Sequence, residues 1–231
     1  RGSSAIESYY GRLNYNFEDR NLHTATLRRY CSSSFAEDHR WATFPWLALG
    51  WRVNNERFMK NIKVINNLRL RLSWGIVGNQ AVWKNYAYGV TMTSSPTPGG
   101  QGFFPGNYSN PDLKWEKTNA YNIGLDLNLF NNRIEFIADF YKKDIDNLLM
   151  QASLPSYVAG VISSPWVNAG AMTNKGMEFT LNTVNISNKS FVWRTGITFS
   201  KNTNEVTDLY TESSALVGEI GGLAYTYTTI G

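Results

Sequence analysis

Two carboxylates, Asp139 and Glu178, come closest to a catalytic pair in this chain of 231 residues. Glycoside hydrolysis requires two carboxyl groups about 5–9 Å apart in a cleft, one of them with a raised pKa. Neither the spacing of these residues nor the character of their neighbours meets that requirement. His23 and His39 lack the spacing of metal ligands, and the chain has no Ser-His-Asp order and no GxGxxG motif. The sequence therefore predicts no enzyme, no metal site and no cofactor.

Binding chemistry is better represented, because aromatic side chains are plentiful between the segments that alternate in polarity. Flat rings line ligand sites, where they stack on sugars or hold peptide side chains. The same rings also pack within loops or form a belt at a membrane interface. The candidates for contact with a ligand or a lid are Trp83, Tyr86, Tyr88, Phe103, Phe104, Tyr108, Tyr157 and Trp166. The six other tryptophans lie near strand ends or on apolar faces, and for most of them an interfacial belt is the better interpretation: Trp41, Trp46, Trp51, Trp74, Trp115 and Trp193.

Composition excludes several classes of protein. The net charge of +4 comes from scattered Lys and Arg without a basic run, so we expect no nucleic-acid partner. The single cysteine, Cys31, excludes an intrachain disulfide framework. No segment approaches the roughly 18–20 apolar residues of a transmembrane helix. A chain of this kind crosses a membrane only with β-strands, and we expect its targeting signal to lie upstream of Arg1.

Apolar and polar residues alternate along eight segments, which is typical of strands with two different faces. The clearest case places five apolar residues on one face and four polar or small ones on the other: Tyr121, Ile123, Leu125, Leu127 and Leu129 against Asn122, Gly124, Asp126 and Asn128. The segments have roughly 8–14 residues, close to the 9–11 that cross a bilayer at a tilt. Six of them are Glu7–Phe17, Leu22–Arg29, Ala42–Val53, Leu68–Val77, Met177–Val184 and Phe191–Asn202, and two more flank Asn131-Asn132.

The connections alternate between short and long. Short ones are expected at Glu18–Asn21, Asn131-Asn132 and Ile186–Ser190, and a medium one at Asn54–Asn67. Long ones are expected at Tyr30–Arg40, Gly78–Leu113 and Met150–Lys175. Outer-membrane barrels have short periplasmic turns and longer extracellular loops. The pattern favours an all-β, antiparallel transmembrane meander over a soluble β-sandwich.

The turn at Asn131-Asn132 fixes the register of its hairpin. We expect Leu129 opposite Ile134, Leu127 opposite Phe136 and Leu125 opposite Ala138, all on the apolar face. On the polar face, Asn128 then meets Glu135, and Gly124 meets Asp139. A slip by one residue would place both carboxylates on the apolar face, where charge is costly in a membrane.

Charged side chains gather on the predicted polar face, which would line the lumen of a barrel. They are Arg28, Arg52, Arg69, Arg71, Asp126, Asp139, Glu178 and Arg194, together with Arg12. One interpretation is a surface that guides a polar or anionic substrate. The preferred interpretation is a ladder of cross-strand ion pairs, because polar lumens are the rule in wide barrels.

Five stretches, in this order, resemble the SusC/RagA-like TonB-dependent outer-membrane transporters of Bacteroidetes. They are YYGRLNYNFEDRNLHTATLRR, WATFPWLALGWRV, LRLRLSWGIVGNQ, NPDLKWEKTNAYNIGLDLNLFNNRI and NAGAMTNKGMEFTLN. The resemblance implies that residues 1–231 are a partial barrel, about eight consecutive strands from the later part of a 22-strand barrel. It also implies that the plug and the periplasmic N-terminal domain lie outside this chain. One departure is Tyr30 to Phe35, where the family usually has Asp-Gly-Ser-Ser-Arg-Phe.

The resemblance implies import of large nutrients, oligosaccharides or peptides, across the outer membrane. The implied partners are a SusD-like surface lipoprotein that acts as a lid, the TonB complex acting through the plug region, and the lipid bilayer. This segment would supply barrel wall, lumen surface and extracellular loops. Two alternatives remain from the residues alone: a small self-contained outer-membrane barrel with an adhesive or structural role, and a soluble glycan-binding sandwich.

Overall fold

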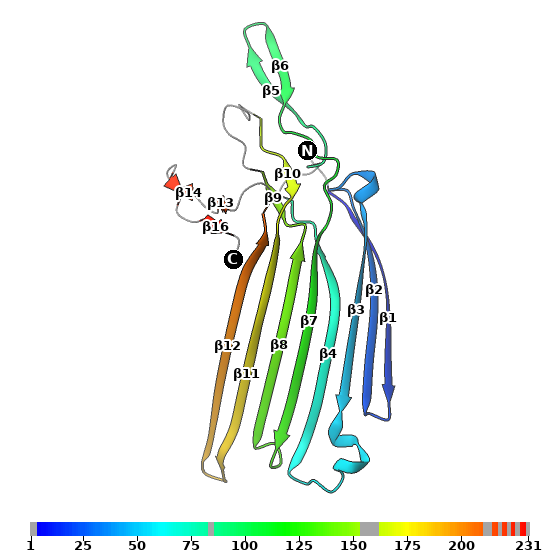
Figure 1. The fold of residues 1–231 in the computed structure, drawn as a ribbon, viewed down its shortest axis with the longest axis vertical. Coiled ribbons are helices and arrows are strands. Elements are labelled where there is room, and N and C mark those ends of the chain that lie inside the picture. The colour runs from blue at the N-terminus through cyan, green and yellow to red at the C-terminus, as the bar shows by residue number, and fades with distance from the viewer. Residues whose placement is uncertain are drawn as a thin grey trace.

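One antiparallel sheet of eight strands dominates the molecule, in the order β1-β2-β3-β4-β7-β8-β11-β12 (Figure 1). The computed structural model describes residues 4–82, 86–152 and 162–209, and the backbone of four short strands after them. The eight strands are β1 Ile6–Phe17, β2 Asn21–Ser32, β3 Trp41–Arg52, β4 Ile65–Asn79, β7 Glu116–Leu129, β8 Ile134–Asp146, β11 Ala171–Ser187 and β12 Val192–Asp208. The short ones are β13 Ser214–Leu216, β14 Glu219–Ile220, β15 Leu223–Ala224 and β16 Tyr227–Thr229, paired as β13–β16 and β14–β15.

All eight predicted strands are confirmed, and the strands of the sheet are 12–17 residues long. Two predicted ends were wrong. Val53 leaves β3 and begins a 3-10 turn, where it is buried, and Phe191 precedes β12. Most of the other strands extend beyond the predicted segments because backbone pairing continues after the alternation of apolar residues stops.

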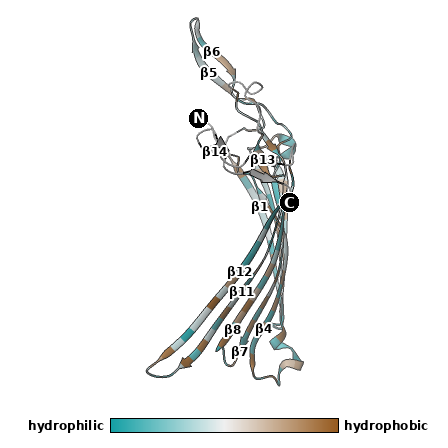
Figure 2. Ribbon diagram, turned by 60° about the vertical axis from the view of Figure 1, so that its left-hand side comes forward, coloured by the Kyte–Doolittle hydropathy of each residue, from teal (hydrophilic) through white to brown (hydrophobic). Residues whose placement is uncertain are grey.

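The register of the β7–β8 hairpin is as predicted. Leu129 pairs with Ile134, Leu127 with Phe136 and Leu125 with Ala138. Phe130, Asn131 and Asn132 have φ values of 54°, 56° and 61°, so the turn runs through left-handed backbone that asparagine tolerates well. Period-two alternation therefore gives the sheet an apolar face and a polar face, visible as alternating bands along the strands (Figure 2).

Short and long connections separate to opposite ends of the sheet, as predicted (Figure 1). The short end carries the turns 18–20, 130–133 and 188–191, and the medium connection with η2 Val53–Asn55 and η3 Arg57–Met59. The loop end carries η1 Glu37–His39, the hairpin β5 Met92–Thr97 and β6 Gly100–Pro105, and the pair β9 Leu149–Gln151 and β10 Trp166–Asn168. The β5–β6 hairpin extends away from the sheet at this end (Figure 1).

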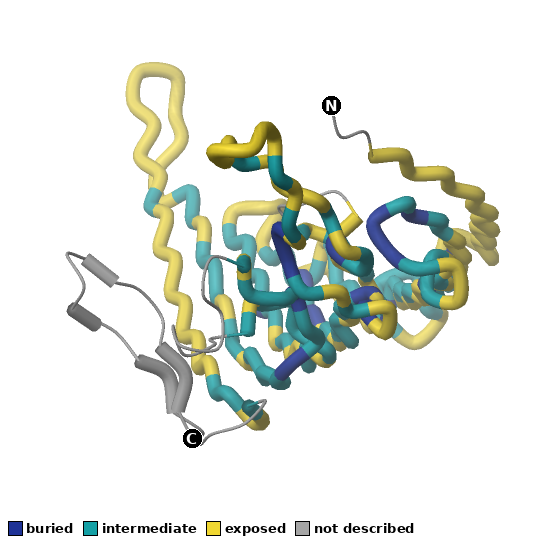
Figure 3. Tube along the Cα trace, turned by 90° about the horizontal axis from the view of Figure 1, so that it is seen from above, coloured by how far each residue is buried: buried dark blue, intermediate teal, exposed yellow. Residues whose placement is uncertain are grey.

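Buried apolar residues gather under the loops, and the strands around them are mostly exposed or half-buried (Figure 3). We call this group the loop-base core: Phe35, Phe44, Ala87, Leu113, Trp115 and Trp166. The apolar face of the sheet exposes large side chains along its whole width, among them Leu13, Leu72, Ile123 and Phe199. In the described residues, no helix has the length and apolar character needed to span a membrane.

Two tryptophans assigned to an interfacial belt lie elsewhere. Trp115 is 5% exposed in the loop-base core, and its Nε1 donates a hydrogen bond of 3.1 Å to the carbonyl oxygen of Arg40. Trp46 lies on the polar face, opposite Thr26 on one side and Gly75 on the other. The belt assignment was wrong for both, because Trp115 precedes β7 and because the even-numbered residues of β3 face the polar side.

Candidate ligand-binding surface

The sheet register brings all nine predicted charged residues, Arg12 included, to the polar face. Asp139 lies opposite Gly124 and Glu178, and Arg69 lies between Arg52 and Asp126 on the neighbouring strands. Arg28 lies on the same face because its register partner on β3, Phe44, lies there. Arg194 lies there for the same reason, with Val184 on β11 as its partner. The side chains nevertheless divide into groups with different surroundings.

Four of them form a cross-strand ion cluster in the middle of the sheet. Asp126, which is 7% exposed, accepts hydrogen bonds from Arg69 Nε at 2.7 Å and from Arg71 Nη2 at 2.8 Å. The same Arg71 Nη2 reaches Asp139 Oδ2 at 3.0 Å. Gly124 leaves the room for these contacts, because a Cβ there would lie 2.6 Å from Arg71 Cζ. The two positive and two negative charges neutralise each other, as the ion-pair interpretation expects.

Asp139 and Glu178 lie directly opposite each other on β8 and β11, which the sequence alone did not indicate. Asp139 is held by Arg71, whereas Glu178 is exposed. Like charges in directly opposite positions destabilise a sheet, and here the guanidinium of Arg71 offsets that repulsion on one side. This arrangement belongs to the ion cluster and supplies no cleft for a pair of catalytic carboxylates.

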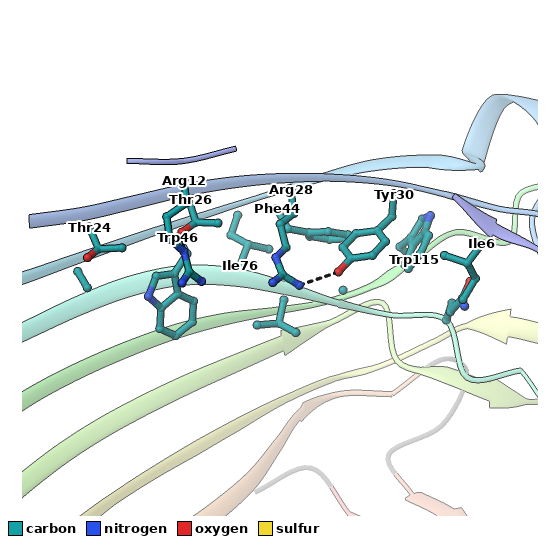
Figure 4. A pocket seen from close by; sticks show the side chains of 14 residues that line it. Ile6, Arg12, Thr24, Thr26, Arg28, Tyr30, Phe44, Trp46, Ile76 and Trp115 are labelled. Atoms are coloured by element: carbon teal, nitrogen blue, oxygen red, sulfur yellow. Dashed lines mark hydrogen bonds between the residues drawn. The ribbon is translucent and has the colours of Figure 1, made fainter. Parts of the chain in front are cut away.

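A hollow of about 590 Å³ opens on the polar face near the loop end (Figure 4). Residues of β1, β2, β3 and β4 line it, together with Gln80 and Trp115, and Trp115 lies between Tyr30 and Ile6 in Figure 4. Arg28 Nη1 donates a hydrogen bond of 3.0 Å to the hydroxyl of Tyr30, and the Arg28 guanidinium lies 5.6 Å from the centre of the Tyr10 ring. Arg12 Nε donates to Thr26 Oγ1 at 3.2 Å.

Glycines set the depth of this hollow. A Cβ at Gly75 would overlap the indole of Trp46, and a Cβ at Gly78 would overlap the ring of Phe44. Both rings therefore lie over β4 at positions without a side chain. Phe44 is buried by its neighbours in the loop-base core, but Trp46 remains 37% exposed and contributes an accessible ring to the lining.

Sequence reasoning placed Arg28 on the polar face but missed its grouping with Trp46, Tyr30 and Thr26. The signal was present in the short turn at 18–20. A hairpin that pairs Phe17 with Asn21 necessarily places Arg12 opposite Thr26 and Arg28 opposite Tyr10. The contribution of Trp115 could not be predicted in this way, because Trp115 precedes β7 and lies outside the β1–β2 hairpin.

The predicted loop aromatics differ in exposure. Phe103 on β6 is 67% exposed and Tyr86 is 43% exposed, whereas Tyr88, Phe104 and Tyr108 are half-buried. The rings of Tyr86 and Tyr88 meet edge to face, with centres 6.2 Å apart. Trp83 and Tyr157 lie outside the described residues.

Trp166 requires a correction. It is 8% exposed, and its ring belongs to the loop-base core. Its backbone carbonyl accepts a hydrogen bond of 2.8 Å from Asn110 Nδ2, so it helps to tie the long loops together. The structure therefore gives Trp166 a packing role in place of the predicted contact with a ligand or a lid.

Asparagines that the sequence analysis did not single out hold the loops in place. Asn107 is 4% exposed; its Oδ1 accepts the amide of Thr91 at 2.8 Å, and its Nδ2 donates to the carbonyl of Gly89 at 2.8 Å. Asn168 accepts the amide of Lys114 and donates to the carbonyls of Lys114 and Asn147. Asparagine side chains commonly bond the backbone of loops in this way, but nothing in their spacing identified these two.

The family model described as TonB dependent receptor-like, beta-barrel matches residues 1–229. The chain belongs to this family. The TonB-dependent receptor SusC of Bacteroides thetaiotaomicron is 38% identical over 213 residues, which is 89% of this chain and 21% of that protein. The TonB-dependent receptor P26 of Formosa agariphila is 35% identical over 207 residues, 88% of this chain and 21% of that protein.

Solved structures agree with this assignment. A chain of the RagAB peptide importer in its closed-closed state matches 99% of this receptor segment with a TM-score of 0.89 and 29% identity. The matched region is 25% of that chain. The siderophore receptor PirA from Pseudomonas aeruginosa matches at a TM-score of 0.57 and 14% identity, which is a likeness of fold alone. This segment thus spans about one fifth of the curated relatives. It is a run of eight adjacent wall strands of a receptor barrel with the loops between them.

Proposed function

We propose that the protein containing this segment imports large nutrients, oligosaccharides or peptides, across the outer membrane in a TonB-dependent manner. Residues 1–231 contribute barrel wall and extracellular loops, and the plug and the periplasmic N-terminal domain belong to other parts of the protein. The apolar face of the sheet meets lipid, and the polar face lines the lumen.

The observation that carries this proposal is the two-faced meander. The match to a chain of the RagAB peptide importer covers 99% of residues 1–231. Every one of the eight strands contributes exposed apolar residues to the apolar face, and water would be an unfavourable neighbour for a surface of that size. Lipid removes that cost, while the charged cluster of Arg69, Arg71, Asp126 and Asp139 remains on the side of a polar lumen.

The partners follow from the same relatives. We propose a SusD-like surface lipoprotein that covers the loop end and the TonB complex, which acts through the plug region. The exposed rings of Tyr86 and Phe103, with the half-buried Tyr88, Phe104 and Tyr108, are the described candidates for contact with the nutrient or the lid. Trp83 and Tyr157 remain candidates from the sequence.

A small self-contained barrel receives no support from the arrangement of strands. β1 and β12 are the two edges of the eight-stranded sheet, and they do not pair with each other. Closure would leave no edge. In a larger barrel both edges pair with further strands, which is what the proposal requires.

The first test is the mass of the native polypeptide extracted from outer membranes with mild detergent and identified by peptides of this sequence. We expect a chain several times larger than the 26.1 kDa of this segment, accompanied by a lipoprotein. Uptake of fluorescent oligosaccharides or peptides by intact cells, with and without a protonophore, then tests energy-dependent import. A lone species of the mass of this segment, or uptake that does not depend on the energised membrane, contradicts the proposal.

A further inference from the structure

The hollow beside β1 and β2 carries positive charge that the strands around it do not neutralise. Glu7 is the only acidic residue in β1, β2 and β3. It pairs with Cys31, and both residues lie on the apolar face, away from the hollow. The polar face of these three strands carries Arg12, Arg28 and Arg52. Arg52 pairs with Asp19 in the adjacent turn, which leaves Arg12 and Arg28 without a carboxylate among the residues the structure describes.

The two arginines occupy neighbouring positions on the polar face of β1 and β2. Arg12 is opposite Thr26 and Arg28 is opposite Tyr10, so the two arginines are diagonal neighbours on the same face. Diagonal neighbours are about 7–8 Å apart at the backbone, within reach for long side chains. Both arginines are exposed, and their contacts in the hollow are to neutral partners, namely a threonine hydroxyl, a tyrosine hydroxyl and a tyrosine ring. The arginines of the ion cluster on β4, β7 and β8 differ from these two, because each of them contacts a carboxylate of the sheet.

One aromatic ring and three hydroxyl groups of the lining suit a ring that bears hydroxyl groups. The indole of Trp46 lies over Gly75, and Trp46 is one of the residues that line the hollow. Thr24, Thr26 and Tyr30 add hydroxyl groups that both donate and accept hydrogen bonds. An aromatic surface with a few convergent polar groups is the usual composition of a small-molecule site.

An extended peptide is a poorer match. Peptides that bind to sheets usually add a strand at an edge through main-chain hydrogen bonds. The backbone of β2 and β3 is already paired on both sides, so the hollow offers side-chain groups only.

We infer that this hollow is a binding site for a carboxylate-bearing sugar, in which Arg12 and Arg28 hold the carboxylate and Trp46 packs against the pyranose ring. The inference rests on the proposed import function and narrows its substrate class to acidic oligosaccharides. The long-range attraction of two unneutralised arginines also concentrates anionic ligands at the loop end of the lumen.

The experiment uses the full-length protein, purified from outer membranes in mild detergent with any bound lipoprotein. The probes are oligosaccharides of galacturonate, glucuronate, mannuronate and guluronate, their carboxyl-reduced neutral counterparts of equal length, and oligoglutamate peptides. The variants are Arg12→Gln and Arg28→Gln, with Arg29→Gln as the matched control. Arg29 has the same charge one residue later but faces the apolar side, where it lies 4.8 Å from the centre of the Trp41 ring.

We expect at least one uronate oligosaccharide to bind, and its neutral counterpart to bind at least about tenfold more weakly, because charge-assisted hydrogen bonds are lost. Arg12→Gln and Arg28→Gln should each lower the uronate affinity by about tenfold, and Arg29→Gln should leave it within about twofold. Heat-modifiable migration on gels verifies that each variant folds.

Four results overturn the inference: binding of neutral sugars only, binding of acidic peptides only, binding of none of the probes, or uronate affinity that is unchanged in both variants. The last result, combined with a lower unfolding temperature, would show that the arginines neutralise a carboxylate of the protein itself. Protonophore-sensitive uptake of a neutral sugar or a peptide separates the two proposals, since it supports import while excluding the acidic-sugar site.

Discussion

At the scale of single residues, the two glycines of β4 shape the polar face. Gly75 and Gly78 occupy the places over which Trp46 and Phe44 lie, and a Cβ at either glycine would overlap the ring. Neither glycine has the positive φ that would require it for conformational reasons. Their role is therefore steric, and it links the backbone of one strand to the orientation of the rings on the next.

The variant Gly75→Ala tests this role. The added methyl group must displace the Trp46 indole, and such overpacking costs about 1–3 kcal/mol of unfolding free energy. Denaturant unfolding of the purified protein in detergent measures the change. Gly11→Ala is the matched control, because a Cβ at Gly11 in β1 meets nothing within 4 Å. Equal effects of the two substitutions would contradict the steric explanation.

The ion cluster gives a second prediction at this scale. Asp126→Asn removes the carboxylate that Arg69 and Arg71 share, and it leaves two guanidiniums side by side. Because the arginine side chains are 33–37% exposed, solvent offsets part of the loss, and we expect destabilisation of about 2 kcal/mol.

Asp112→Asn is the control for this substitution, since the Asp112 side chain is 90% exposed in a loop. It should change the unfolding free energy by less than about 0.5 kcal/mol. Denaturant unfolding measures both variants, and a loss at Asp126 no larger than the loss at Asp112 would show that the cluster does not stabilise the wall.

At the scale of elements, the strands were predictable where burial on one face is periodic. The segment from Tyr121 to Leu129 alternates without interruption, and the turn at Asn131-Asn132 fixes its partner, so strand, face and register could all be predicted. The loop-end parts of β11 and β12 were missed because polar residues, among them Thr173, Asn174 and Thr203, occupy both faces of the strands there. In these parts, only the backbone pairing shows that the chain forms a strand.

The loop elements were beyond the sequence for a different reason. The β5–β6 hairpin consists mostly of Thr, Ser, Pro and Gly, a composition that is typical of a loop. The loop-base core joins Phe35, Phe44 and Trp115, which lie far apart in the chain, so it exists only once the sheet has brought their segments together. The alternation of side chains along each strand predicts which arginines lie on the polar face. Which of them meet a carboxylate depends on the register between the strands.

Asn107 gives a prediction for the β5–β6 hairpin. Asn107→Ala removes the bonds to the Thr91 amide and the Gly89 carbonyl, and it leaves two half-buried backbone groups unsatisfied, each at a cost of up to about 1–3 kcal/mol. Hydrogen exchange of residues 86–110 should become at least about tenfold faster, while exchange in β7 and β8 stays unchanged. Gln101→Ala on the exposed β6 is the control and should leave exchange in this segment unchanged. Equal acceleration throughout the sheet would contradict a local anchoring role.

At the scale of the whole molecule, the two faces require two different surroundings. Phe136, Phe179 and Phe199 form a row of stacked rings across β8, β11 and β12 on the apolar face, with centres 6.2 Å apart at each step. One residue further along β12, Ser200 points to the polar face and lies opposite Glu178. If the proposed orientation holds, adjacent positions on this strand face lipid and lumen, with the backbone environment held nearly constant.

The pair Phe199→Arg and Ser200→Arg tests which face meets lipid. An arginine at position 199 must enter the hydrocarbon layer, which costs about 2–4 kcal/mol near the midplane and removes the stack with Phe179. An arginine at position 200 faces the exposed carboxylate of Glu178 and gains an opposite charge across the strands. In cells, the amount of heat-modifiable protein in outer-membrane fractions should fall strongly for Phe199→Arg and remain near the wild-type level for Ser200→Arg. Equal assembly of both variants would mean that the apolar face is covered by protein, and the reverse order would place lipid on the polar face, so either result would remove the physical basis of the transporter proposal.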